Sequence, residues 1–349
     1  MYVIRKGDKA MNDPNGERFA SAAACVCERI RLPLLSLPGE VRRSAQEIRL
    51  RTGRPVCVCC PGGVYFLKKS GGVSCLPEPD CLTASKTDLE ESFRILCGYS
   101  VYSHENEIKN GYVTIRGGHR VGICGTAVVQ NGSVAGVRDV SSLGVRVARE
   151  VPGAADRLLG LLGNDVSGGL LIAGPPASGK TTVLRDVARQ LSDGLRGMPL
   201  KVAVVDERGE IAGVFRGEPQ NDVGRCCDVL DGYPKAEGIL TAVRSLSPQV
   251  VICDELGTQA ETEAVGQSLN AGVAVVASIH AGSVGELIRR KQAAALLETG
   301  AFRRVAMLGG HDTPGKIRGI YKAGDLLAEG DGGGSADRRG VSRGLSGVV

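Results

Sequence analysis

The feature that most constrains the fold is a glycine-rich segment in the middle of the chain. Residues 174–181 read Gly-Pro-Pro-Ala-Ser-Gly-Lys-Thr; an apolar run at 170–173 precedes them, and a helical pattern begins at Thr181. The segment fits G-x-x-x-x-G-K-[ST], in which the glycines let backbone N–H groups turn toward phosphate groups. A strand, a tight loop and a helix in this order predict an α/β fold with a parallel sheet and crossover helices.

We predict that this loop binds a nucleotide. In such a loop the Lys180 side chain reaches the β and γ oxygens of a triphosphate, and the Thr181 hydroxyl can ligate Mg²⁺. The other interpretation of the segment is a plain glycine-rich turn between a strand and a helix. The residues expected to contact the nucleotide are Gly174, Pro175, Pro176, Ala177, Ser178, Gly179, Lys180, Thr181 and Thr182.

Three further apolar runs predict neighbouring strands of the same sheet. They span Lys201 to Asp206, Gln249 to Cys253 and Val273 to Ile279, and each is almost continuously apolar, as expected where helices cover both faces. The second run is followed by Asp254 and Glu255. Because ligands of open α/β sheets bind at the carboxyl ends of strands, we expect Asp254 to hold Mg²⁺ through water and Glu255 to orient or deprotonate the attacking water.

Two other strand ends carry candidate side chains. Asp206 is followed by Glu207, a second carboxylate that competes with Glu255 for the attacking water; the alternative is that this acidic pair caps the next turn. The run at 273–279 is followed by His280, which could contact the γ-phosphate or the neighbouring acids, although a lone histidine is more often an ordinary loop residue. The residues alone do not rank Glu207 against Glu255.

Length and composition place this core in a chain of about two domains. The 349 residues carry 43 Lys and Arg against 38 Asp and Glu, a net charge of +5, which is too small to indicate a nucleic-acid-binding protein. We expect a smaller α+β domain at 1–150, the α/β domain at 151–325 and a disordered Gly/Ser/Arg tail at 326–349. No apolar run is long enough to span a membrane and the first residues lack an apolar signal core, so we expect a soluble, cytoplasmic protein.

The first domain combines helical patterns with short strands. Helices are predicted from about Arg18 to Leu35 and from Lys86 to Cys97, and Asn131-Gly132 indicates a hairpin turn. Of the twelve cysteines, three lie in one apolar run, Cys57 to Cys60, that predicts a strand. Paired C-x-x-C units at zinc spacing are absent, and without a signal core we expect reduced thiols that pack as small apolar side chains. The other interpretation is metal or redox chemistry.

Taken together, the four strand ends resemble those of the hexameric secretion and pilus-retraction ATPases, a RecA-like branch of the P-loop proteins. The elements follow that family's order: the phosphate loop, an acidic box at Asp206-Glu207, a Walker B run that ends at Glu255, and a histidine box at Ser278-Ile-His280. The resemblance favours a functional His280. The chain departs from the secretion branch at Asp254, where that branch usually has Gly, and at Ala281, where it usually has Thr.

A closer resemblance is to the stage III sporulation protein AA family of endospore-forming bacteria. Four segments spread over both halves carry it: Glu47–Pro55, Asn110–Gly125, Val204–Gly213 and Ser247–Gly257. The resemblance implies a RecA-like P-loop ATPase core behind a smaller N-terminal domain, with ATP and Mg²⁺ as cofactors. It also implies a ring, expected to be a hexamer, that energises a secretion-like channel between mother cell and forespore. Attachment to the mother-cell side of the membrane would then go through membrane-embedded channel proteins.

Rings of this kind imply arginines that reach the γ-phosphate from a neighbouring subunit. The candidates lie in the first domain, at Arg116, Arg120, Arg138 and Arg146, and Arg120 is the first choice because flanking glycines in the segment GGHRVG should expose it. The other interpretation is a basic strand face. His119, beside it, is expected to be a surface residue.

The sequence leaves two rival functions open. One is a nucleic-acid translocase, since many RecA-like rings move strands; Arg42-Arg43 and Arg49-Leu50-Arg51 leave room for it, while the modest charge and the 3% of aromatic residues disfavour it. The other is a nucleotide-dependent assembly factor that does not hydrolyse ATP. The two carboxylate pairs argue against that function.

Overall fold

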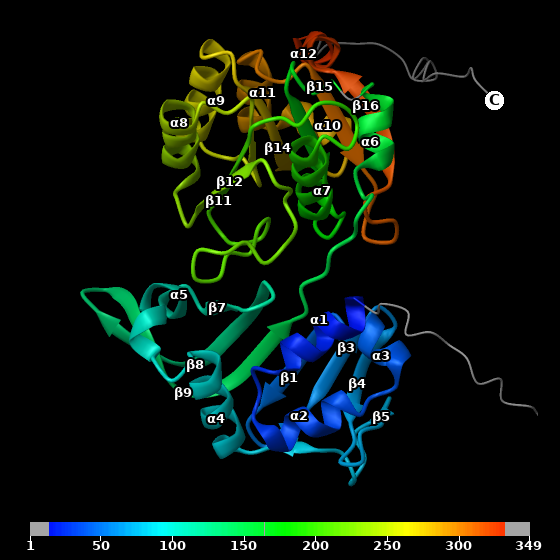
Figure 1. Cartoon of the computed structure of the whole chain (residues 1–349), viewed down its shortest axis with the longest axis vertical. Coiled ribbons are helices and arrows are strands. Elements are labelled where there is room, and N and C mark those ends of the chain that lie inside the picture. Colours follow the sequence, from blue (N-terminus) through cyan, green and yellow to red (C-terminus); the bar gives the residue numbers. More distant parts are fainter. Residues whose placement is uncertain (1–13, 164, 332–349) are drawn as a thin grey trace, which may run out of the picture. The chain divides into compact units, whose positions relative to one another are not determined.

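The computed structural model describes residues 14–163 and 165–331, and the chain divides into two compact units. Unit 1 comprises the residues up to Arg149 together with Phe215–Gln220, and unit 2 comprises Glu150–Val214 and the residues from Asn221 onward. Figure 1 labels the elements of both units. Among the described residues, no helix combines the length and the apolar character that a membrane span requires.

Unit 2 is built on a seven-stranded sheet in the order β12-β11-β13-β14-β10-β15-β16. All neighbouring strands run parallel except the pair β15 and β16 at one edge. The four strands predicted to carry the site therefore lie side by side, and their carboxyl ends meet at one edge. The strands are β10 (Leu170–Gly174), β11 (Val202–Asp206), β12 (Cys227–Asp231), β13 (Val250–Cys253), β14 (Ala274–His280), β15 (Arg304–Leu308) and β16 (Ile317–Lys322).

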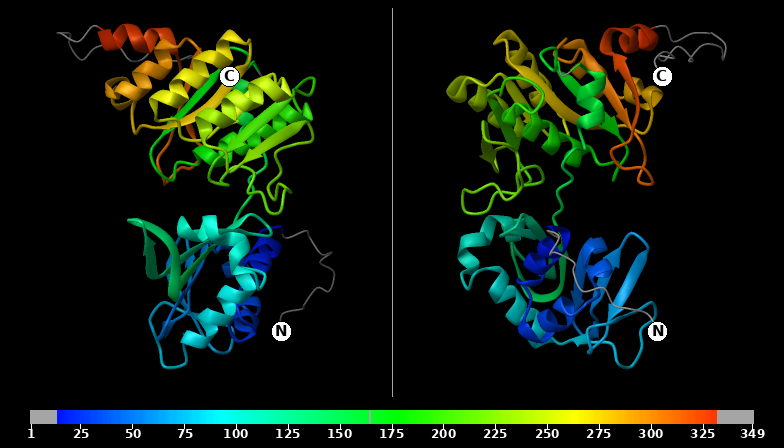
Figure 2. Two further views of the ribbon diagram at one scale, coloured as in Figure 1. Left: turned by 90° about the vertical axis from the view of Figure 1, so that its left-hand side faces the viewer. Right: turned by 45° about the vertical axis from the view of Figure 1, so that its right-hand side comes forward.

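Helices cover both faces of this sheet, which explains why its strands are apolar throughout. Along β10, Leu170 and Ile172 pack with α6 and α7, whereas Leu171 and Ala173 pack with the helices on the other face. Those helices are the yellow-green to red ribbons of unit 2 in Figure 2. The helices are α6 (Asp156–Leu161) and α7 (Lys180–Asp193) on one face, and α8 (Lys235–Leu246), α9 (Gln259–Asn270), α10 (Val284–Arg289), α11 (Lys291–Glu298) and α12 (Ala323–Asp331) on the other.

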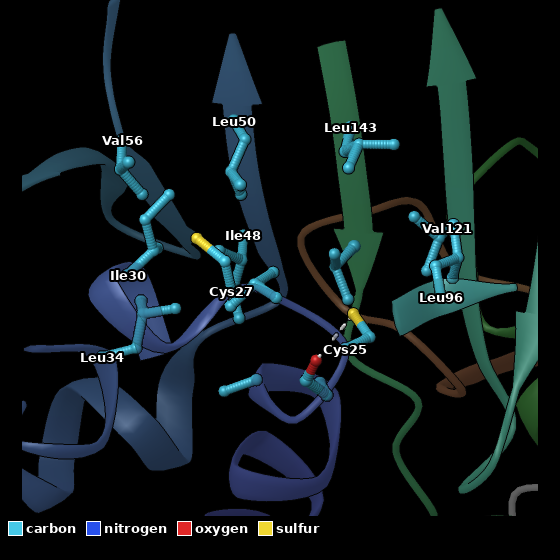
Figure 3. Packing of buried hydrophobic residues seen from close by; sticks show 14 of the residues in the cluster. Cys25, Cys27, Ile30, Leu34, Ile48, Leu50, Val56, Leu96, Val121 and Leu143 are labelled. Carbon is cyan, nitrogen blue, oxygen red and sulfur yellow. Dashed lines mark hydrogen bonds between the residues drawn. The ribbon is translucent and has the colours of Figure 1, made fainter. Parts of the chain in front are cut away.

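Unit 1 is an α+β unit with an antiparallel sheet in the order β5-β4-β3-β1-β9-β8-β7. In β1 and in the first half of β8, buried and less buried residues alternate, so one face of the sheet contributes to the core. Figure 3 shows Ile48 and Leu50 of β1 facing Ile30 and Leu34 of α2. The strands are β1 (Glu47–Arg51), β2 (Arg54–Pro55), β3 (Cys57–Cys60), β4 (Gly63–Leu67), β5 (Val73–Ser74), β6 (Thr83–Ala84), β7 (Tyr112–Ile115), β8 (His119–Gln130) and β9 (Ser133–Arg146). The helices are α1 (Pro14–Ala23), α2 (Glu28–Leu35), α3 (Gly39–Ser44), α4 (Lys86–Leu96), η1 (Val101–His104) and α5 (Glu105–Lys109).

Two sequence predictions need correction at this level. The helix expected from Arg18 to Leu35 is two helices, because the backbone N–H of Cys27 donates to the Ser92 hydroxyl, 2.9 Å away, instead of continuing the helical ladder. The tail expected from residue 326 starts too early, because α12 extends to Asp331 and buries Leu326 against the core of unit 2. The remainder of the expected tail, 332–349, lies outside the described residues.

The cysteines fit the predicted apolar role only in part. Among the twelve, Cys25, Cys27, Cys57, Cys81, Cys97 and Cys253 are buried, and Cys75, Cys124 and Cys226 are exposed. Burial raises the pKa of the Cys253 thiol to about 12, which makes it a poor nucleophile. In the part of the chain that the structure describes, no cluster of three or more His, Cys, Asp or Glu residues could hold a metal ion.

Candidate nucleotide-binding site

The loop between β10 and α7 has the backbone that an anion site requires. Ala177 and Gly179 adopt positive φ values of 57° and 85°, which turns the loop back on itself before α7 begins at Lys180. No side chain caps the first turn of α7, so its N–H groups point outward with the positive end of the helix dipole. The loop therefore presents backbone donors to an incoming phosphate.

The loop is also held from its far side. The backbone N–H of Gly315, in the connection between β15 and β16, donates to the carbonyl of Ser178 at 2.8 Å. A Cβ atom on Gly179 would approach the Gly315 nitrogen to 2.9 Å, so both chains run too close for a side chain there. The Ser178 hydroxyl is buried and has no hydrogen-bond partner within the described structure. The connection between β15 and β16 thus fixes the shape of the phosphate loop.

Lys180 is folded back over its own loop. Its ammonium donates to the carbonyls of Gly174 and Pro175, at 3.1 and 3.0 Å, and lies 3.2 Å from Nδ1 of His280. Burial lowers the pKa of this ammonium, and the charges of Asp254 and Glu255 act in the opposite direction. Carbonyl oxygens are weak partners for a buried ammonium, so a phosphate oxygen would replace them favourably.

Thr181 and Asp254 meet at the first turn of α7. The Thr181 hydroxyl donates to one carboxylate oxygen of Asp254 at 2.5 Å. The other oxygen accepts from the Ser278 hydroxyl on β14 and from the backbone N–H of Glu255. The carboxylate that ends β13 is thus oriented by two neighbouring elements and points at the residue expected to ligate the metal.

This pair fits Mg²⁺ bound in the manner of phosphate-loop proteins. Mg²⁺ uses one or two protein oxygens and takes its other ligands from substrate phosphates and water. Thr181 and Asp254 provide one hydroxyl and one carboxylate at a contact distance, and the described residues hold no all-protein metal cluster. The Thr181 hydroxyl and the Asp254 carboxylate suit a metal that takes its other ligands from a bound nucleotide and water.

Glu255 and His280 complete a chain of contacts with Lys180. Nε2 of His280 lies 2.7 Å from one oxygen of the Glu255 carboxylate, and its Nδ1 faces the Lys180 ammonium. The imidazole of His280 thus lies between the Lys180 ammonium and the Glu255 carboxylate. Arg208 contacts the second Glu255 oxygen at 3.3 Å. The chain brings together three of the predicted residues.

The acidic box at the end of β11 is divided between two tasks. Asp206 is buried and accepts hydrogen bonds from four consecutive backbone N–H groups, those of residues 210–213. It therefore caps the next turn, which is one of the two interpretations of this pair. Glu207 instead lies 3.3 Å from the Lys235 ammonium. Its ion pair is thus with a residue outside the phosphate loop.

Lys235 and Glu261 are site residues that the sequence reasoning missed. Lys235, the first residue of α8, contacts Glu207, Glu261 and the backbone carbonyl of Glu255. Glu261 is the third residue of α9 and forms a capping box with Thr258; the spacing T-x-x-E could have revealed that box. Nothing in the sequence distinguishes Lys235 from a surface lysine.

A small cavity lies between the ends of β11 and β13. It has a volume of about 20 Å³, enough for one water-sized group. Its walls are Val205, Asp206, Glu207, Arg208, Glu210, Lys235, Asp254 and Glu255. Both candidate water-activating glutamates line it.

The candidates in the first domain all belong to unit 1. The guanidinium of Arg120 stacks over the Tyr112 ring, 3.6 Å from its centroid, and is only half-exposed, whereas Arg116, Arg138 and Arg146 are exposed. The prediction for His119 is wrong: its side chain is fully buried, because it faces the core side of β8. Its Nδ1 accepts a hydrogen bond from the Ala148 N–H at 2.9 Å, and burial lowers the pKa of His119 to about 4.

Comparison with known proteins shows to which family the chain belongs. The family model described as "Sporulation stage III, protein AA" matches residues 25–326. The chain belongs to this family. A member from Bacillus subtilis (strain 168), named stage III sporulation protein AA, is 41% identical over 308 residues, which cover 88% of this chain and 96% of the relative. The family predicted from the sequence is therefore confirmed.

Solved structures show what fold this sporulation family has. The ATPase DotB of Legionella pneumophila superposes with a TM-score of 0.52 at 17% identity, over 79% of this chain and 74% of its own. The pilus retraction motor PilT, solved with bound ADP, gives 0.50 at 18% identity, over 75% and 74%. At these identities the likeness establishes the fold alone. The predicted α/β fold of the core, with its parallel sheet, is confirmed.

Proposed function

We propose that this member of the sporulation family is a Mg²⁺-dependent ATPase of the secretion type, which hydrolyses ATP to ADP and phosphate. The observation that carries the proposal is the pairing of the Thr181 hydroxyl with the Asp254 carboxylate, beside a chain of contacts from Lys180 through His280 to Glu255. A phosphate-binding loop alone would serve a protein that only binds nucleotides. Hydrolysis also needs a carboxylate near the metal, here Asp254, and a second one that can act on water, here Glu255.

Each residue has a part that its contacts support. The N–H groups of the phosphate loop and the Lys180 ammonium bind the phosphates, and Lys180 exchanges its carbonyl contacts for phosphate oxygens. Thr181 and Asp254 would hold Mg²⁺, which neutralises phosphate charge when bound. Within the loop, Ser178 offers its unpartnered hydroxyl to the same anion.

We assign the attacking water to Glu255. Its carboxylate lies one residue from Asp254 and is oriented by His280 and Arg208, whereas Glu207 is oriented by Lys235. His280 contacts both Lys180 and Glu255, so it can report occupancy of the phosphate site to the carboxylate that positions water.

The assembly and its cellular role extend the family relationship. We propose a ring of identical subunits, expected to be a hexamer, in which an arginine of unit 1 reaches a neighbour's nucleotide. The candidates are Arg120, which would have to leave the Tyr112 ring, and the exposed Arg116, Arg138 and Arg146. The ring would power a sporulation channel between mother cell and forespore through membrane-embedded partner proteins, from the cytoplasmic side.

The decisive experiment compares ATP hydrolysis by the wild type and by Lys180→Ala. We expect the variant to lose at least about 100-fold in turnover, because the ammonium stabilises charge on the transferred phosphoryl group. Lys201→Ala, which removes an exposed lysine of the same unit, is the matched control and should retain wild-type turnover. Hydrolysis by Lys180→Ala at the wild-type rate would refute the site assignment.

The same assay separates the rival functions. An ATPase of the secretion type should respond little to added DNA or RNA, whereas a translocase should show nucleic-acid-stimulated turnover that weakens with salt. An assembly factor that only binds nucleotide would bind ADP and show no turnover in the wild type.

A further inference from the structure

Lys235 occupies an unusual position in unit 2. It is the first residue of α8, and only 8% of its surface is exposed. A cation at the amino end of a helix is unfavourable because it meets the positive end of the helix dipole. Burying an ammonium adds a desolvation cost. Favourable contacts of the Lys235 ammonium must offset both the dipole cost and the burial cost.

Three segments converge on the Lys235 ammonium. It lies 3.3 Å from a Glu207 oxygen at the end of β11 and 3.4 Å from a Glu261 oxygen in the first turn of α9. The shortest of its contacts, at 2.9 Å, goes to the backbone carbonyl of Glu255. The two carboxylates compensate the positive charge of the ammonium, and the ammonium donates a hydrogen bond to the Glu255 carbonyl.

The backbone of Glu255 needs that support. Its φ of 47° lies in the left-handed region, where a residue with a side chain costs about 1–3 kcal/mol. The N–H of Glu255 is held by the Ser278 hydroxyl at 2.9 Å and by Asp254, and its carbonyl is held by Lys235. The residue is therefore clamped at both peptide groups.

This backbone conformation decides where the Glu255 side chain goes. From the left-handed position the carboxylate reaches Nε2 of His280 and the Arg208 guanidinium. If Glu255 rotated about its N–Cα bond to a negative φ, its Cβ and its carbonyl would move together, and these contacts would be lost. By holding the carbonyl of Glu255, Lys235 therefore influences the position of the Glu255 side chain without touching it.

We propose that Lys235 is a positioning residue that holds the strained backbone of Glu255 through its carbonyl and thereby aims the Glu255 carboxylate at the reacting water. The inference rests on the proposed ATPase function. It differs from the simpler role of a counter-ion, in which Lys235 would only neutralise Glu207 or Glu261.

Charge-balanced variants distinguish these roles. Lys235→Met removes the ammonium and retains the aliphatic stem. Combining it with Glu207→Gln, or with Glu261→Gln, removes one carboxylate as well and avoids leaving an unpaired charge in a buried place. A counter-ion role predicts that one of these double variants regains turnover. A positioning role predicts that neither does, because the Glu255 carbonyl is still unsupported in both.

The measurements are kcat per ADP-binding site, KM for ATP, the ADP dissociation constant and the thermal unfolding midpoint. We expect Lys235→Met and both double variants to lose about tenfold to a hundredfold in kcat, the range seen when a reacting group is misplaced by about 1 Å. KM and ADP affinity should stay within about threefold, since the contacts of Lys235 are with residues outside the phosphate loop. Lys291→Met, at the exposed start of α11, is the control for loss of a lysine and should change nothing.

Three outcomes would overturn the inference. The first is near-wild-type kcat in Lys235→Met or in either double variant. The second is a loss of ADP affinity that parallels the loss of kcat, which would mean that Lys235 supports the whole site. The third is a wild type that binds ADP without turnover; this result refutes the proposed function itself and is recognised without any Lys235 variant.

Discussion

The same dipeptide, Asp-Glu, lies at the ends of two neighbouring strands of unit 2, β11 and β13, and its aspartate makes different contacts in the two places. Asp206 is 3% exposed and accepts hydrogen bonds from four backbone N–H groups of the turn that follows it. Asp254 is half-buried and accepts hydrogen bonds from the hydroxyls of Thr181 and Ser278. The strand ends are adjacent and parallel, so position in the sheet does not separate them. The difference comes from the residues after each aspartate.

After Asp206 the chain turns back so that consecutive N–H groups face the carboxylate, with Gly209 and Gly213 at positive φ. After Asp254 it is Glu255 itself that turns, and the next residues lead into the capping box of α9. The first aspartate is enclosed by its own loop, and the second stays open toward α7. The Asp206 carboxylate therefore organises its own loop, while the Asp254 carboxylate faces Thr181 at the start of α7.

The largest expected effect concerns the stability of the β11 turn. Asp206→Ala should lower the free energy of unfolding by about 3 kcal/mol, because it leaves buried backbone N–H groups without an acceptor. Chemical unfolding of the variant measures this, and Asp228→Ala, an exposed carboxylate on the adjacent strand β12, is the control. A loss below about 1 kcal/mol would mean that Asp206 does not organise the turn.

The next largest effect compares the two glutamates. Glu255→Gln should lower kcat about 100-fold, the contribution of a group that acts on the attacking water. Glu207→Gln should lower it by about fivefold or less, because Glu207 faces Lys235. Steady-state ATP hydrolysis by the two variants, measured together, tests the contrast. Equal losses, or a larger loss for Glu207→Gln, would reverse the assignment.

The smallest effect concerns the metal. Asp254→Asn should raise the Mg²⁺ concentration needed for half-maximal hydrolysis about tenfold, since a carboxylate is a better partner for Mg²⁺ than an amide. Binding of ADP in the absence of Mg²⁺ should not change. A Mg²⁺ titration of turnover gives the result, and an unchanged midpoint would remove Asp254 from the metal site.

Most of the features that depend on local pattern and strand order are predictable from the sequence. The apolar runs, the phosphate loop and the strand-end residues identify the sheet, and parallel strands bring their ends together for a general reason. The contact of Thr181 with Asp254 and the contact of His280 with Glu255 agree with that arrangement. The family resemblance adds an expected order for the phosphate loop, the acidic box, the Walker B run and the histidine box.

The remaining features depend on tertiary contacts that no local pattern encodes. Lys235 is buried because three segments distant in sequence close around it. His119 is expected at the surface beside Arg120, but the pleat of β8 places its side chain on the core side. The break between α1 and α2 comes from a hydrogen bond of Cys27 to a helix residue 65 positions later in the chain.

The hydrogen bond from Gly315 to the Ser178 carbonyl bears on how much of the chain supports the phosphate loop. The strands that carry the candidate residues are complete at His280, and β15 closes the parallel part of the sheet at Leu308. A fragment that stopped at either point would retain the phosphate-loop residues but lose the connection that holds their carbonyl side. A fragment in which the phosphate loop keeps this support must therefore extend beyond β15 at least to Gly315, although none of the candidate nucleotide contacts lies beyond His280.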